Sequence, residues 1–283
     1  MANIIFERKE IEKEIKLTDE IVEKINMMGI PVEKLTKDEL EIQVLPNRPD
    51  LLSLENFTRA LKAFINKSPG LKKYPVKAPE KNYKVKIDPS VKKVRPYTVC
   101  AIVKNLKLDD SKIKILVDLQ EKLHTTIGRN RKKSAIGIYP LEKISLPIKY
   151  LAKKPKDISF IPLEETKEMN GLQILQKHPK GRDYAHLLEN EPLFPIFADA
   201  KNNILSLPPI INSHLTGKIT EKTNEVFVEC SGSHYETLEK TLNIIVTTLA
   251  EMGGKIYAME LDYGKKITTP TLTPKKMKIS LEN

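Results

Sequence analysis

The chain has 283 residues, of which 40% are hydrophobic and 30% charged, a composition typical of a globular protein with one large or two smaller cores. No stretch approaches the roughly eighteen apolar residues of a transmembrane helix, and the charged residues soon after Phe6 argue against a signal peptide. Lys and Arg exceed Asp and Glu by 48 to 37, a net charge of +11, which favours a polyanionic partner but also fits a Lys-rich surface that serves solubility.

The chain carries none of the common catalytic or metal-binding signatures. It has no Gly-rich phosphate loop, no paired CxxC, no HExxH and no GxSxG, and its five histidines lack metal-ligand spacing. We therefore expect no metal site and no membrane partner. Cys100 and Cys230 each lie inside an apolar segment, so we expect free thiols and a reducing, cytoplasmic location.

The first part of the chain predicts a small α/β domain over residues 1–71. Thr18 can cap a helix that ends at Gly29, and a short strand is expected at 41–44. A second helix, with apolar side chains at helical spacing, is predicted over 54–64. Helices and a strand in this order indicate a compact α/β unit.

A polar, proline-containing segment at 72–82 is predicted to be a linker. Beyond it, apolar strands are separated by helices at about 112–127 and after Cys230, and a hairpin is expected where 192–198 turns back into 204–207. The predicted strands are 83–87, 97–103, 135–139, 192–198, 204–207, 226–230 and 255–261. Because strands and helices alternate irregularly, the predicted fold class is α+β.

One segment with a possible chemical role runs from Leu205 to Ser213. Its Pro208-Pro209 pair ends the hydrogen-bond ladder of the preceding strand and fixes a rigid loop, and Asn212 adds a polar side chain. Such a loop suits the wall of an open pocket for an apolar side chain with one polar tip. The alternative is a stiff turn packed on the core.

A second segment, Glu229 to His234, lies where a strand runs into a helix. Ser231 and Ser233 could present hydroxyls and backbone N–H groups to a bound carbonyl or ribose. The alternative is that Ser233 only caps the helix.

A basic cluster precedes the strand at 135–139. Arg129, Arg131, Lys132 and Lys133 suit RNA phosphates, although a solvated helix end explains them equally well. His124, on the helix before this cluster, is expected to be a surface or capping residue rather than a general base.

Several motifs taken together resemble one enzyme family. The sequence PNRPDLLSLE at 46–55 resembles the N-terminal motif of phenylalanine–tRNA ligase beta subunits, and later segments resemble the archaeal and eukaryotic branch of that family. These later segments are 119–124, 128–138, 178–181, 205–213 and 243–246. Because the motifs follow the family order over roughly residues 40–260, the chain is identified as a member of the family.

The resemblance implies a domain organisation and an activity. Residues 1–71 would be a B1-like domain, 83–263 a larger mixed-sheet tRNA-editing domain of the B3/B4 type, and 264–283 the truncated start of a B5 domain, so that the chain would be a fragment. The editing domain would hydrolyse mischarged Tyr-tRNA(Phe). The full enzyme would be an alpha-two beta-two tetramer that binds tRNA(Phe) and uses ATP and magnesium, with no cofactor in this segment.

The resemblance also implies roles for individual residues. Leu205, Pro208, Pro209, Asn212 and Glu229 would bind the tyrosine moiety. Ester hydrolysis would depend on a second set, which is Ser213, Ser231, Ser233 and His234. The third set, Arg129, Arg131, Lys132 and Lys133, would hold tRNA phosphates.

The chain departs from the family pattern at 231–234, which reads Ser-Gly-Ser-His where relatives usually have Thr-Gly-Thr-Asp, and at 213–216, which reads Ser-His-Leu-Thr where relatives have Ser-Glu-His-Thr. His234 therefore stands in place of an acidic group. Two alternatives remain open: a free-standing deacylase that acts on released mischarged tRNA, and a non-catalytic RNA-binding or assembly module.

Overall fold

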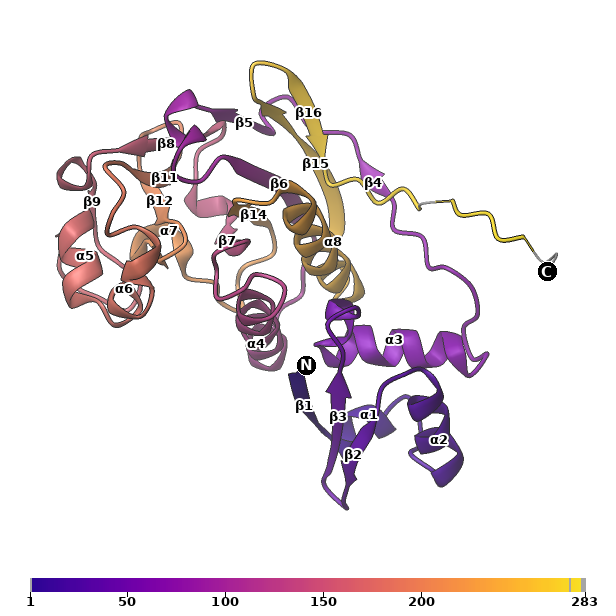
Figure 1. The fold of residues 1–283 in the computed structure, drawn as a ribbon. Coiled ribbons are helices and arrows are strands. Elements are labelled where there is room, and N and C mark those ends of the chain that lie inside the picture. Colours follow the sequence, from indigo (N-terminus) through magenta and orange to yellow (C-terminus); the bar gives the residue numbers. More distant parts are fainter. Residues whose placement is uncertain (1, 275, 281–283) are drawn as a thin grey trace.

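A small antiparallel sheet begins the chain, as shown by the computed structural model, which describes residues 2–274 and 276–280 (Figure 1). Its strand order is β1-β3-β2. The strands are β1 (Ala2–Glu7), β2 (Val32–Leu35) and β3 (Glu39–Val44), and the accompanying helices are α1 (Arg8–Glu12), α2 (Asp19–Met27) and α3 (Leu54–Phe64). Pairing of Ile4 with Ile42 places both apolar side chains in the core beneath these helices.

The helix boundaries follow from capping, as the sequence indicated. The Thr18 hydroxyl accepts a hydrogen bond from the Ile21 N–H at 3.4 Å, and Gly29, with φ of +74°, stops α2. The Ser53 hydroxyl caps α3 in the same way through the Asn56 N–H. Both predicted helices of this unit are confirmed.

A large mixed sheet makes up most of the remaining structure, which confirms the α+β fold class. In the described residues it contains eleven strands, with the order β13-β12-β11-β8-β5-β15-β6-β14-β7 and with β4 and β16 added beside β15. The strands are β4 (Val76–Lys77), β5 (Lys84–Ile87), β6 (Tyr97–Lys104), β7 (Ala135–Pro140), β8 (Ile148–Lys153), β11 (Phe194–Ala198), β12 (Ile204–Leu207), β13 (Ile211–Asn212), β14 (Val226–Gly232), β15 (Lys255–Asp262) and β16 (Lys266–Thr269). The predicted hairpin is the antiparallel pair β11–β12.

Two long helices cover one face of strands β6, β14 and β7 (Figure 1). They are α4 (Asp110–Thr125) and α8 (Tyr235–Glu251). Alternate strand residues such as Val99 and Val228 pack beneath α8 residues such as Leu242 in one cluster. Residues on the opposite face, including Phe227, pack with Tyr150 and Leu205 from the other half of the sheet, so the sheet curls around a second core.

Smaller elements complete the domain beside β11 and β12. They are β9 (Ser159–Phe160), β10 (Met169–Asn170), α5 (Gly171–Lys177), α6 (Pro179–Tyr184) and α7 (His214–Gly217). The helices α5 and α6 cover a third cluster that includes Ile174, Phe194 and Leu207. Short 3-10 turns at 49–51, 89–92, 141–143, 155–157 and 185–187 connect the elements.

The segments on either side of the predicted editing domain also take part in its sheet. Within 72–82, which was predicted to be a linker, β4 pairs in parallel with β15. Beyond the predicted boundary at residue 263, β16 pairs with β15, and the Thr269 hydroxyl bonds both the N–H and the C=O of Cys100. Residues 275 and 281–283 of the predicted B5 segment lie outside the described residues.

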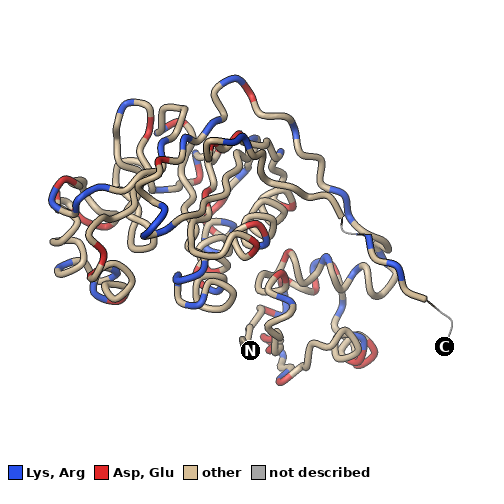
Figure 2. Tube along the Cα trace, turned by 45° about the horizontal axis from the view of Figure 1, so that its top comes forward, with Lys and Arg blue, Asp and Glu red and all other residues tan. Residues whose placement is uncertain are grey.

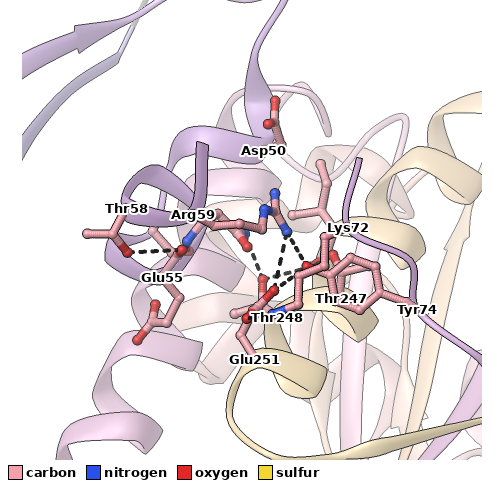
Figure 3. Close-up of polar contacts among 12 residues, drawn as sticks. Asp50, Glu55, Thr58, Arg59, Lys72, Tyr74, Thr247, Thr248 and Glu251 are labelled. Atoms are coloured by element: carbon pink, nitrogen blue, oxygen red, sulfur yellow. Dashed lines mark hydrogen bonds and ion pairs between the residues drawn. The ribbon is translucent and has the colours of Figure 1, made fainter. Parts of the chain in front are cut away.

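A polar junction joins the N-terminal unit to α8 (Figure 3). The Arg59 guanidinium donates to the Tyr74 hydroxyl at 2.8 Å, and that hydroxyl bonds the carboxylate of Glu251. Lys72 pairs with the same carboxylate at 2.6 Å. Beside this network, the Asn56 amide donates to the Thr248 hydroxyl at 2.8 Å between α3 and α8. These bonds hold the N-terminal unit, the following segment and α8 together.

Candidate functional site

Two of the predicted segments are joined by a pair of buried arginines at the end of β14. Arg95, which is 5% exposed, donates from Nε to the Ser231 hydroxyl at 3.1 Å and also bonds the Ser231 carbonyl. Its Nη2 donates to the Arg131 carbonyl at 3.1 Å. Arg131 in turn donates to the carbonyls of Pro209 at 3.2 Å and Ile210 at 2.9 Å. The proline segment and the serine-bearing strand end are therefore neighbours.

Glu229 forms the centre of a buried polar cluster on this side of β14. The Tyr139 hydroxyl lies 3.3 Å from Glu229 Oε1 and 3.3 Å from Asn212 Oδ1. Glu229 is 2% exposed, and its Oε2 has no hydrogen-bond partner among the described residues, nor has the Ser206 hydroxyl. The Tyr139 hydroxyl fits beside Glu229 only because residue 137 is a glycine. Gly137 lies opposite Glu229 in the sheet, and a Cβ there would lie 2.2 Å from the Tyr139 hydroxyl oxygen. Unpartnered buried oxygens are rare in native cores and suit a ligand that can donate.

Burial governs the protonation of this cluster. It raises the pKa of Glu229 to about 8, because the charged form is poorly solvated there, although Arg95, Tyr139 and Ser231 counteract the rise. The pKa of Tyr139 is also raised well above its usual value. Burial is the largest cause, and the nearby Glu229 is the second. At pH 7 the Glu229 carboxyl is therefore mainly neutral and can both donate and accept a hydrogen bond.

This protonation makes stability depend on pH. Because the pKa of Glu229 is about 8 in the folded protein against 4.5 ordinarily, the folded protein keeps a proton that the unfolded chain releases over that range. The contribution of this group is fully present below pH 4.5 and is lost as the pH rises to about 8. Relative to Glu229→Gln, we expect the free energy of unfolding to fall by about 1.4 kcal/mol per pH unit between pH 5 and 8. Urea unfolding at several pH values measures this change in the free energy of unfolding. Parallel profiles of that free energy against pH for the two proteins would contradict the prediction.

The basic loop before β7 adopts an unusual backbone. Arg129, Asn130 and Arg131 have φ angles of +48°, +51° and +66°, which form a left-handed turn that costs about 1–2 kcal/mol per residue. The turn directs Arg131 inward, where it is 6% exposed, pairs with Glu121 at 2.7 Å and lies 4.3 Å from the Tyr184 ring centre. Arg131 was predicted to bind phosphate, and this was wrong, because its guanidinium is engaged inside the protein.

The other members of the basic cluster remain accessible. Arg129 and Lys132 are exposed and Lys133 is half-buried, so these three side chains can still reach phosphate. Lys and Arg elsewhere are spread over both units rather than gathered on one face (Figure 2), so the net charge alone does not locate a binding surface.

His124 is not a surface residue, contrary to the prediction. It is 3% exposed, and its Nε2 accepts the Ile136 N–H at 2.9 Å. Burial lowers its pKa, so it is neutral at pH 7. It anchors the basic loop to β7.

Ser233 and His234 lie at the surface immediately beyond the buried Ser231. His234 caps α8, because its Nδ1 accepts the Thr237 N–H at 3.3 Å. The Ser233 hydroxyl donates to the Lys132 carbonyl at 3.4 Å. The strand end, the start of α8 and the basic loop thus meet at one place.

Ser213 and Leu205, two further predicted site residues, are both buried. Ser213 is 2% exposed, caps α7 by accepting the Leu215 N–H, and lines a groove of about 700 Å³ whose other residues include Lys149 and Lys153. Leu205 is fully buried in the same core cluster as Tyr139. Asn212 and Ser213 point to opposite sides because neighbouring residues alternate in extended chain, and only Asn212 reaches Tyr139.

The open cavity that we expected between the proline loop and the strand end is filled by side chains. Pro208 and Pro209 are buried, their common peptide bond is cis, and Arg131 and Tyr139 occupy the space beside them. A second groove, of about 1580 Å³, lies between α3, residues 68–74 and α8, and neither groove is lined by Glu229. Entry of a ligand at Glu229 therefore requires side chains to move.

Arg95 and Tyr139 were missed by sequence reasoning. Arg95 lies in the predicted loop before a strand, and Tyr139 looks like an ordinary core residue. A buried Arg is rare, but nothing in the sequence marks Arg95 as buried. Across residues 2–274 and 276–280, no group of His, Cys, Asp and Glu could hold a metal ion, and no helix combines the length and apolarity needed to cross a bilayer.

Sequence comparison with known proteins finds relatives that are the same subunit of one enzyme. The chain is 42% identical over 236 residues to the phenylalanine–tRNA ligase beta subunit of Thermococcus sibiricus, covering 83% of this chain and 42% of that protein. It is 39% identical over 263 residues to that of Methanococcoides burtonii, covering 92% and 48%. The chain thus spans less than half the length of these curated relatives. No protein-family model matches it.

A solved structure shares the fold. The crystal structure of an N-terminal fragment of the phenylalanyl-tRNA synthetase beta subunit from Pyrococcus horikoshii superposes with a TM-score of 0.89 at 36% identity. The match covers 97% of this chain and 81% of that one.

Proposed function

Because the chain belongs to the family of phenylalanine–tRNA ligase beta subunits, we propose that it binds tRNA(Phe) and hydrolyses mischarged Tyr-tRNA(Phe). The reaction is cleavage of the ester between tyrosine and the terminal ribose by water. Charging of tRNA(Phe) with phenylalanine, with ATP and magnesium, would require the alpha subunit in an alpha-two beta-two enzyme. We place this enzyme in the cytoplasm.

The observation that carries the proposal is a phenol held by a buried carboxyl. Tyr139 presents its hydroxyl between Glu229 and Asn212, and Glu229 Oε2 remains unpartnered among the described residues. A substrate tyrosine that displaced the Tyr139 side chain would find the same acceptors. The basic loop and Ser233 lie at the adjoining surface, where an RNA terminus could be held.

The energetics favour tyrosine over phenylalanine at such a site. An apolar pocket discriminates poorly against a ligand that only adds a hydroxyl, roughly a hundredfold. A buried polar cluster discriminates in the other direction, because phenylalanine would leave Glu229 and Asn212 unpaired at about 1–3 kcal/mol each. An editing site of this kind would therefore remove tyrosine that an apolar aminoacylation site had attached to tRNA(Phe) by mistake.

The hydrolytic step would use groups at the strand end. Ser233, with nearby backbone N–H groups, would orient the ester carbonyl and ribose, while Ser231, buried and bonded to Arg95, would hold the strand end in position. His234 Nδ1 accepts the Thr237 N–H, which leaves the Nε2–H to donate a hydrogen bond to the ester carbonyl. Arg129, Lys132 and Lys133 would hold the phosphates that precede the ester.

The test is deacylation by this chain of tRNA(Phe) charged with tyrosine and, separately, with phenylalanine. We expect faster release of tyrosine than of phenylalanine, and a slower rate in His234→Ala. Ser159→Ala is the matched control, because Ser159 is an exposed residue that lines the other groove, and it should keep the wild-type rate. Release of tyrosine at the spontaneous rate would contradict the proposal.

A second candidate is a tRNA-binding module without hydrolysis. The specific observation in its favour is that Tyr139 and Arg131 fill the space that a tyrosyl group would need. On this account, the chain would bind charged and uncharged tRNA(Phe) equally and deacylate neither.

A further inference from the structure

A pair of aromatic rings, one exposed and one half-buried, lies beside the candidate site. The rings of Tyr97 and Tyr235 meet edge to face, with centres 5.9 Å apart and an angle of 79° between their planes. Tyr97 is 39% exposed, and every other tyrosine in the described residues is less exposed than Tyr97. An edge-to-face pair braces one ring while leaving part of its face open, so Tyr97 offers a flat apolar surface to solvent.

The strand pairing of the sheet places this aromatic pair next to the basic loop. Tyr97 begins β6 and pairs with Gly232 of β14, and Tyr235 begins α8 three residues later. On the other side, Gly232 packs so closely on the loop that a Cβ there would lie 1.9 Å from the Lys133 carbonyl oxygen. Neighbouring strands are about 4.8 Å apart, so the Tyr97 and Lys133 backbones are separated by only about 10 Å.

The loop is held in shape before any ligand binds. Its left-handed turn persists because Arg131 is tied to Pro209, Ile210 and Glu121, and because the loop backbone bonds back to Gly128 and His124. Strained backbone of this kind is concentrated at functional sites, where surrounding contacts maintain it. With Arg131 turned inward, Arg129 and Lys132 are left on the outer side.

We propose that Tyr97, braced by Tyr235, is a stacking platform for a base in the single-stranded 3′ end of tRNA, with Arg129 and Lys132 contacting the adjacent phosphates. This inference rests on the proposed function, since it assigns a subsite to the same RNA. Aromatic faces beside basic side chains bind single-stranded RNA because every base can stack and every phosphate is an anion. The exposed Glu236 and half-buried Glu239 on α8 would repel phosphate, so the RNA backbone would follow the loop rather than the helix.

The test is the affinity of the 283-residue chain for tRNA(Phe) with an intact 3′ end and for the same tRNA lacking its last four nucleotides, measured by fluorescence anisotropy. Tyr97→Ala should weaken binding of the intact tRNA about 5- to 100-fold and leave binding of the shortened tRNA unchanged. Tyr97→Phe, which keeps the ring, should bind as the wild type does. Phe64→Ala is the matched control, because Phe64 is an aromatic of similar exposure, 42%, on the N-terminal unit.

Unchanged affinity of Tyr97→Ala for intact tRNA, or equal losses for the intact and shortened forms, would overturn the proposal. The deacylation assay separates this outcome from failure of the editing function. Wild-type release of tyrosine with no effect of Tyr97→Ala on affinity would leave editing in place and remove the platform. The selective loss of affinity without any deacylation would leave the platform and remove editing.

Discussion

Replacing Glu229 with leucine is expected to lower kcat/KM for hydrolysis of Tyr-tRNA(Phe) about 10- to 100-fold, because the substrate phenol then enters a buried site without its main partner. Leucine has nearly the same shape, so the space beside Tyr139 and Ser231 is kept. The rate for Phe-tRNA(Phe) should not fall, since phenylalanine gains nothing from the carboxyl. The ratio of the two rate constants is therefore the measurement.

Glu229→Gln is the matched control for this variant. Because burial raises the pKa of Glu229 to about 8, the working form at pH 7 is the neutral acid, and a glutamine amide can also both donate and accept. We expect Glu229→Gln to keep most of the activity. Equal activity of Glu229→Leu and the wild type would show that Glu229 takes no part in recognising tyrosine.

Replacing Arg131 with methionine should lower the free energy of unfolding by about 3–5 kcal/mol, the usual effect of removing one member of a buried charged network. The change leaves the Pro209 and Ile210 carbonyls without their donor, leaves Glu121 without its ion pair, and removes the contacts that hold the left-handed turn. Urea unfolding followed by circular dichroism measures the loss.

Arg129→Met provides the comparison for Arg131→Met. Arg129 belongs to the same left-handed turn but is exposed, so its replacement should change stability by less than about 0.5 kcal/mol. It should instead weaken tRNA binding. If the two variants were equally stable, the account of Arg131 as the brace of the basic loop would be wrong.

The fold could be predicted where local chemistry decides the outcome. Thr18 and Gly29 delimit α2 through capping and a positive φ, and the apolar spacing of α8 reflects burial on one face. Several strands were missed, among them β1, β2, β8 and the short β4. β4 is two residues long and acquires its strand geometry from β15, about 180 residues away, so no local pattern reveals it.

The candidate site could be predicted only in part, for the same reason. The strand end at Ser231 and Asn212 were found because polar residues follow apolar strands, and the basic loop was found by its charge. Arg95 and Tyr139 were not found, because their burial depends on contacts between residues far apart in sequence. The predicted role of Arg131 was wrong because three consecutive left-handed residues reverse the direction in which its side chain points.

The central claim is that Glu229 and Asn212 bind the phenol of a tyrosyl ester, and calorimetry with non-hydrolysable tyrosyl- and phenylalanyl-adenosine analogues tests it most directly. We expect the wild-type chain to bind the tyrosyl analogue about tenfold or more tightly than the phenylalanyl analogue, and Glu229→Leu to lose that preference. Equal affinity of the wild type for the two analogues, or a preference that survives in Glu229→Leu, would contradict the claim.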